Sequence, residues 1–168
     1  DIKNYFEKTL QRSLQEIDLS LFTSYLTLDA GINEGKNEVQ FLFVYDKESR
    51  HLQHCQPSDL QEELNGVAFQ SPYGEFSFTG VPSEGMVSRE DLFMDLLSVV
   101  SDSADVKRMI VVSFNEEYGK KVTDVLQGLK GKEVMQFRMN EPEIPVNYKW
   151  DMLAFPVMHS LGIRAEEL

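Results

Sequence analysis

Cysteine is almost absent from this chain, and long apolar runs are absent altogether. The single Cys55 among 168 residues cannot form a disulfide within the chain, which fits a reducing compartment and predicts a cytoplasmic protein. No stretch approaches the roughly 18 apolar residues that a membrane-spanning helix needs. The first ten residues lack the basic and apolar regions of a signal peptide, although the missing initiator Met leaves a removed segment open.

Positive charge is also scarce. Sixteen Lys and Arg residues face 28 Asp and Glu residues, for a formal net charge of −12. A surface of this sign repels phosphate backbones and anionic lipids, so neither nucleic acid nor a membrane is an expected partner. It attracts basic proteins or peptides. The simpler interpretation, which stays open, is that the acidity only keeps the chain soluble.

The motifs that mark common catalytic and metal sites are missing. His51, His54 and Cys55 lie within five residues, a composition rich in metal ligands. In a strand, however, His51 and Cys55 would lie about 13 Å apart at roughly 3.3 Å per residue, with His54 on the opposite face. A cysteine nucleophile needs a nearby histidine, and only His159 could reach Cys55 from a distant part of the chain. We therefore expect no metal, no cofactor and an unreactive cysteine.

The residues that are present predict one domain of the α+β class. The chain length is typical of a single domain, and 42% hydrophobic residues can build a sizeable core. We predict a mainly antiparallel sheet with helices packed on it, extended by a C-terminal β-α-β unit. The loop near residues 101–107 is the one candidate seam within residues 1–168.

The first hundred residues predict alternating helices and hairpins. The region 22–29 fits a strand, with a helix as the alternative, and strand 38–46 carries apolar residues on both faces, which predicts a central position. A helix capped by Ser88 should bury Leu92, Phe93, Leu96, Leu97, Val99 and Val100. The expected segments are helix 2–17, strands 22–29, 38–46 and 51–56, helix 59–64, strands 67–70 and 75–79, and the helix after Ser88.

This element order, α-β-β-β-α-β-β-α over residues 1–100, together with the acidic charge, resembles the class I secretion-chaperone fold. The resemblance is one of element order and implies a fold of that kind, with no particular residue role.

The last third predicts parallel strands. An apolar run at 109–114, a helix capped by Asn115 and a strand at 134–139 form a β-α-β unit, which should have a right-handed crossover. Residues 148–155 fit either a strand or a helix, and Pro156 should begin a last short helix closed by Gly162. Trp150, Met152 and Phe155 could line a pocket but are more typical of core.

Two groups of residues are candidate sites. The first is an acidic partner-binding surface around the helix that follows Ser88, for which a merely solvated face is the alternative. The second is the β-α turn at 114–119, where α/β folds often bind ligands, although acids are also ordinary at a helix start. The first group comprises Glu90, Asp91, Asp95, Asp102 and Asp105; the second comprises Asn115, Glu116 and Glu117, together with His159.

These features favour a non-enzymatic protein–protein interaction module of the chaperone, immunity or regulatory type. The alternative is a small hydrolase-like enzyme with its site at the 114–119 turn and His159. A third possibility is an acidic mimic of nucleic acid aimed at a DNA-binding protein. The sequence leaves the oligomeric state open.

Overall fold

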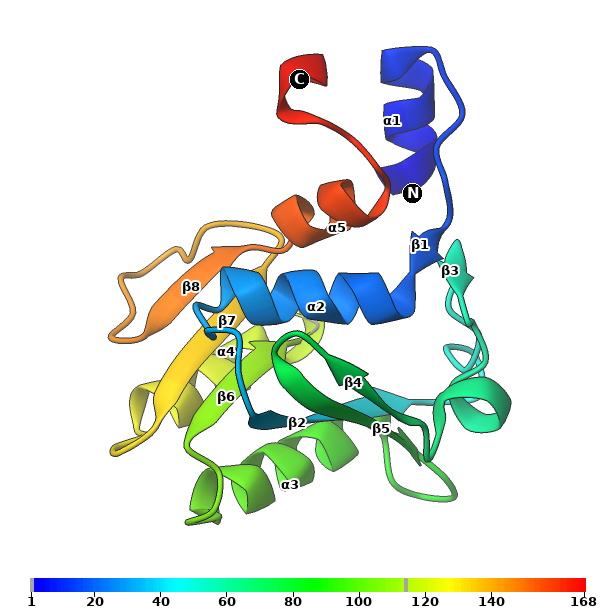
Figure 1. Ribbon diagram of the computed structural model, residues 1–168. Helices are drawn as coiled ribbons and strands as arrows, with labels where there is room; N and C mark the ends of the chain where they lie inside the picture. Colours follow the sequence, from blue (N-terminus) through cyan, green and yellow to red (C-terminus); the bar gives the residue numbers. More distant parts are fainter. Residues whose placement is uncertain (1, 114) are drawn as a thin grey trace. The chain divides into compact units, whose positions relative to one another are not determined.

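The computed structural model describes residues 2–113 and 115–168, and it shows an α+β chain with helices and mixed sheets (Figure 1). The residues group into two compact units, one made of 1–82 with 154–168 and the other of 83–153. The loop at 101–107 lies inside the second unit. None of the helices in the described ranges combines the length and apolar character that crossing a bilayer requires.

The first unit is built around a three-stranded sheet in the order β2-β5-β4. β2 pairs with β5 in parallel over nine residues, and β4 pairs with β5 antiparallel. Its elements are α1 (Ile2–Leu10), β1 (Ile17–Asp18), α2 (Leu19–Asp29), β2 (Asn37–Tyr45), β3 (Cys55–Gln56), the π-helical turn η1 (Leu60–Leu64), β4 (Ala68–Ser71), β5 (Gly74–Pro82), α5 (Ala154–Ser160) and the 3-10 turn η2 (Ala165–Glu167).

Aromatic side chains fill one face of that sheet. Phe76 and Phe78 of β5 are buried, as their alternation predicts, and Phe41 lies 5.1 Å from both rings. Leu19 of α2 and Leu60 of η1 belong to the same apolar cluster, so these two elements cover the aromatic face.

The second unit places two helices against a parallel sheet in the order β6-β7-β8. Leu97, Val111, Val122 and Val134 belong to one core that joins both helices to the sheet. The parallel pairing of β6 with β7 through α4 agrees with the β-α-β expectation, and the hand of the crossover stays a prediction. Its elements are α3 (Arg89–Asp102), β6 (Arg108–Val112), α4 (Asn115–Gln127), β7 (Glu133–Arg138) and β8 (Lys149–Met152).

The expected strand at 22–29 is wrong, because this segment is the helix α2. Asp18 caps the helix by accepting hydrogen bonds from the backbone N–H groups of Ser20 and Leu21. The hydroxyls of Thr23 and Thr27 donate to carbonyls four residues earlier, which satisfies these β-branched side chains inside a helix.

The sheet arrangement also differs from the expectation. In the described chain the pairs β1-β3, β2-β5, β6-β7 and β7-β8 are parallel and β4-β5 is antiparallel, so the sheets are mixed rather than mainly antiparallel. β5, not β2, is the central strand of its sheet. The first helix ends at Leu10 instead of residue 17, since Gln11 adopts a positive φ of 53°. The element order of the secretion-chaperone fold is therefore not reproduced.

Candidate partner-binding surface

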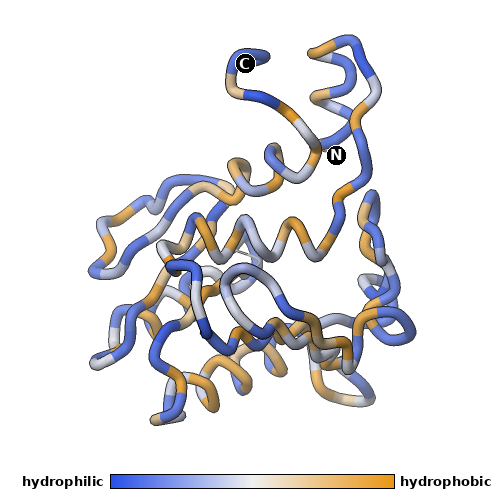
Figure 2. Tube along the Cα trace, in the orientation of Figure 1, coloured by the Kyte–Doolittle hydropathy of each residue, from blue (hydrophilic) through white to orange (hydrophobic). Residues whose placement is uncertain are grey.

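α3 carries most of the predicted partner-binding acids, and its local structure follows from its sequence. Ser88 caps the helix, with its hydroxyl oxygen accepting a hydrogen bond from the Asp91 N–H at 3.0 Å, as predicted. Leu97 is buried and Phe93 packs on the same core. Val99, expected on the buried side, is instead 66% exposed. Hydrophobic and hydrophilic segments alternate along α3, as expected for a helix with one buried face (Figure 2).

The first turn of α3 is tied to α4 by two ion pairs. The Glu90 carboxylate accepts a hydrogen bond from the Lys121 ammonium, and Arg89 lies 3.4 Å from Glu117. The hydrogen bond to Glu90, the charge of Glu90 and then the charge of Asp91 raise the pKa of Lys121. Acids in the first turn also complement the helix dipole. Glu90 and Asp91 therefore have structural roles within the second unit.

The remaining acids of this group have no such role. Asp95, Asp102 and Asp105 are exposed, and none forms an ion pair with any residue in the described ranges. Asp95 lies one turn from Asp91, where like charges repel slightly. Asp102 lies in the last turn, where negative charge opposes the helix dipole. Lys132 supplies the cation at this end by donating to the carbonyls of Ser103 and Val106.

Asp91, Asp95 and Asp102 share one side of α3 with an exposed apolar residue, Val99. At 100° per residue, Asp91, Asp95, Val99 and Asp102 fall within an arc of about 80°. We call these four residues the α3 acidic face. Met86, which is fully exposed, precedes the helix. Carboxylates around an exposed apolar side chain are a suitable composition for binding a basic protein surface.

The residues of the enzymatic alternative are distributed over both units. Glu117 is paired with Arg89, and Glu116 is exposed at the start of α4. His159 belongs to the first unit, is exposed, and has its ring 5.3 Å from that of Tyr25. Phe114 and the Asn115 side chain lie outside what the structure describes. The hydrolase with its site at the 114–119 turn and His159 stays a prediction.

The histidine and cysteine segment is not a single straight strand. His54 adopts a positive φ of 60°, and Cys55 pairs with Ile17 in the short sheet β1-β3. Cys55 is half-buried, and burial, followed by the charge of Glu16, raises the pKa of its thiol. Over residues 2–113 and 115–168, no group of three or more His, Cys, Asp or Glu side chains is placed to hold a metal ion.

His51 takes part in a network that the sequence did not indicate. Its Nε2 lies 3.2 Å from an Asp59 oxygen, and the Arg50 guanidinium donates to both oxygens of the same carboxylate at 2.8 Å. These hydrogen bonds hold the pKa of Asp59 well below its usual range. Asp59 also caps η1 by accepting from the N–H groups of Gln61 and Glu62. A carboxylate fixed in this way maintains the loop and is poorly suited to accept a proton.

A second unpredicted network surrounds Gln136 in the central strand β7. This side chain is fully buried, and its carbonyl oxygen accepts hydrogen bonds from Tyr148 at 2.8 Å and Arg138 at 3.3 Å. A glutamine between the apolar residues Met135 and Phe137 was the available sequence signal. Trp150 and Met152 on β8 are half-buried, and Phe155 is 48% exposed, so none of the three is fully buried in the core that their composition favoured.

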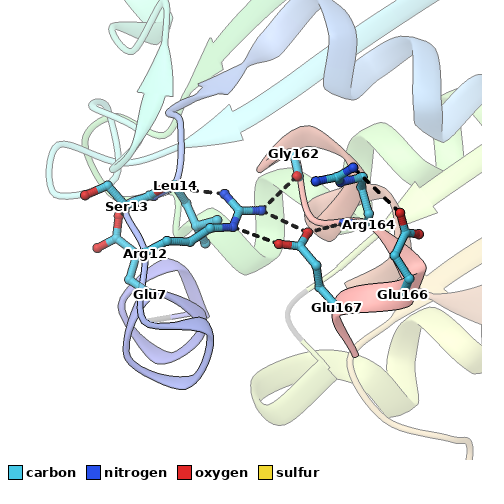
Figure 3. Close-up of polar contacts among 8 residues, drawn as sticks. All are labelled: Glu7, Arg12, Ser13, Leu14, Gly162, Arg164, Glu166 and Glu167. Carbon is cyan, nitrogen blue, oxygen red and sulfur yellow. Dashed lines mark hydrogen bonds and ion pairs between the residues drawn. The ribbon is translucent and has the colours of Figure 1, made fainter.

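The two terminal segments meet in the first unit. Arg12 donates two hydrogen bonds to Glu167, at 2.8 and 2.9 Å, and one to the carbonyl of Gly162 (Figure 3). Leu14, Leu161 and Ile163 form a buried cluster in the same unit. The sequence separation of about 150 residues hides this contact from any local pattern.

The model of a family of unknown function (DUF6621) matches residues 1–168. No curated protein and no solved structure matches the chain.

Proposed function

We propose that this chain, which belongs to the DUF6621 family, is a non-enzymatic interaction module that binds a basic protein or peptide through the α3 acidic face. The proposal places the interaction in a reducing compartment such as the cytoplasm, in keeping with the single unpaired cysteine.

The observation that carries the proposal is the difference between the acids of α3. Glu90 and Asp91 are accounted for by the helix dipole and by Lys121. Asp95 and Asp102 are exposed, have no ion-pair partner in the described ranges, and each lies where its charge is neutral or unfavourable for the helix. Exposed carboxylates that do not stabilise the isolated chain would be paired with the positive charges of a bound partner, and they therefore support the proposal.

The expected binding mode follows from the composition of this face. Carboxylates at Asp91, Asp95 and Asp102 would steer a cationic partner and fix its orientation, while Val99 would supply apolar contact at one edge of the face. Rim charges of this kind mainly raise the association rate, so binding should weaken strongly with salt.

The experiment is a pull-down with the tagged full chain, repeated from about 0.05 M to about 0.5 M salt. The test variant carries Asp95→Asn and Asp102→Asn. The matched control carries Glu34→Gln and Glu48→Gln, which removes the same charge from exposed positions of the first unit. The proposal is supported if the wild-type chain captures a basic partner and this capture is lost as the salt concentration rises. The test variant should fail to capture the partner, and the control variant should retain it.

Equal retention by both variants, or no partner at any salt concentration, would contradict the proposal. If the partner is captured, competition with duplex DNA tests the narrower idea of a nucleic-acid mimic. The mimic predicts that DNA displaces the chain from its partner, because both would occupy the same cationic surface.

A further inference from the structure

One of the two nine-residue strands in the described ranges, β2, lies at the edge of its sheet. β2 pairs with β5 through nine consecutive residues, Asn37 to Tyr45, and β5 separates it from β4. Apart from its bonds to β5 and one from the Asn37 N–H to the Tyr73 carbonyl, β2 makes no backbone hydrogen bond to any residue in 2–113 or 115–168. One row of its backbone groups is therefore unpaired by the described chain.

The two edges of this sheet differ in how they are protected. β4 is four residues long and is followed by Pro72, which are common ways of preventing an edge from pairing with another chain. β2 contains no Pro, Gly, Lys or Arg, and its pairing with β5 is continuous. Its only charged residue is Glu38. Leu42, on the face opposite the aromatic cluster, is 37% exposed. This composition is typical of a strand with neighbours on both sides.

We propose that the second neighbour of β2 is β2 of another copy of this chain, paired antiparallel about a twofold axis at Phe41. The two sheets would then join into one continuous sheet of six strands, with both aromatic faces on the same side.

Charge selects this register. Centred on Phe41, the pairing places Val39 opposite Phe43 and Gln40 opposite Leu42, with Glu38 opposite Val44. Just beyond the strand, Lys36 of each copy lies opposite Asp46 of the other. An attractive pair of charges is therefore present at each end of the paired strands.

The neighbouring registers are less complementary. Centring on Leu42 sets Glu38, which lies within the strand, opposite Asp46, so like charges oppose each other at both ends, and it moves the partner of Lys36 to Glu48 in the turn beyond the strand. Centring on Gln40 leaves Lys36 opposite the apolar Val44. A parallel arrangement would align Glu38 with Glu38 of the second copy.

The first test is the mass of the purified full chain in solution. Sedimentation and light scattering over a range of concentrations should give twice the 19.3 kDa of the monomer. Leu42→Lys should return the monomer mass, because a lysine at the centre of the edge blocks strand addition. Gln70→Lys adds the same charge on exposed β4 and should leave the dimer intact. Circular dichroism checks that both variants fold.

The second test fixes the register without depending on one substitution. The double variant Gln40→Cys with Leu42→Cys should form a disulfide-linked dimer on mild oxidation, because facing residues lie about 4.5–5.5 Å apart between Cα atoms. Glu38→Cys with Leu42→Cys should remain unlinked. A wild-type chain that is monomeric at every concentration, or a dimer that is insensitive to Leu42→Lys and linked equally by both cysteine pairs, would overturn the proposal.

Discussion

Cys55 has two histidines close in sequence, but its surroundings disfavour the reactive form of its thiol. Two histidines lie within four residues of it, yet the structure pairs its backbone with Ile17 and half-buries its side chain. The thiolate is the nucleophilic form of cysteine, and both burial and the charge of Glu16 disfavour it. The chemistry suggested by His51, His54 and Cys55 is thus opposed by the position of the thiol.

This leads to a prediction about the reactivity of Cys55. Alkylation by iodoacetamide at neutral pH should be much slower in the folded chain than in the chain unfolded in urea, because the raised pKa reduces the thiolate fraction. Glu16→Gln should accelerate the folded-state reaction modestly, since it removes the smaller of the two causes. Glu34→Gln, at an exposed position, is the control. Equal rates in the folded and unfolded chains would contradict this description of the site.

At the scale of the element, α3 combines acids that stabilise the helix with acids that do not. Glu90 and Asp91 occupy the first turn, near the positive end of the helix dipole, whereas Asp102 occupies the last turn. The periodicity and the Ser88 cap allowed the helix and its acidic side to be predicted. The ion pairs could not be predicted, because Lys121 and Glu117 come from α4, about 30 residues away in the sequence.

Substitutions at the two ends of α3 should therefore have opposite effects on stability. Asp91→Asn is expected to lower the free energy of unfolding and Asp102→Asn to raise it, each by about 0.3–1 kcal/mol. Urea unfolding at low ionic strength measures both. Asp105→Asn, at an exposed position beyond the end of α3 without an ion pair in the described ranges, provides a reference for the loss of one carboxylate. The same Asp102→Asn change should weaken partner binding, so a variant that gains both stability and binding would argue against the proposed role of the face.

At the scale of the whole molecule, contacts between distant segments complete the first unit. Arg12 joins Glu167, and the backbone N–H of Arg164 also donates to Glu167 (Figure 3). The hydrogen bonds from Arg12, followed by that from Arg164, lower the pKa of Glu167 to about 2. A carboxyl whose folded pKa is lowered contributes stability above its unfolded pKa, and that contribution is lost as the pH falls toward the folded value.

The expected pH dependence of stability follows from the lowered pKa of Glu167. Glu167→Gln should reduce stability at neutral pH and should flatten the decline in stability between about pH 4.5 and about pH 2. Urea unfolding across this range is the measurement. Glu166→Gln is the matched control, because Glu166 is 71% exposed and its one ion pair within residues 2–113 and 115–168 is with Arg164, at 3.7 Å. A decline in the Glu167→Gln variant as steep as in the wild type would show that this ion pair does not set the acid stability.

The sequence by itself determined the features that depend on near neighbours. Alternation located the buried faces of β5, and hydrophobic periodicity with a capping serine located α3. The acidic surface followed from composition alone. These signals are local because side-chain direction in a strand or helix depends on spacing of a few residues.

Only the tertiary structure decided which elements are neighbours and which charges are paired. Thr23 and Thr27 favour a strand by propensity, but the cap at Asp18 and burial in the first unit hold them in α2. β2 has the composition of a central strand, yet β5 occupies that place. Strand order and ion-pair partners depend on contacts between residues far apart in the chain. Local sequence patterns do not predict these contacts, because they reflect only near neighbours.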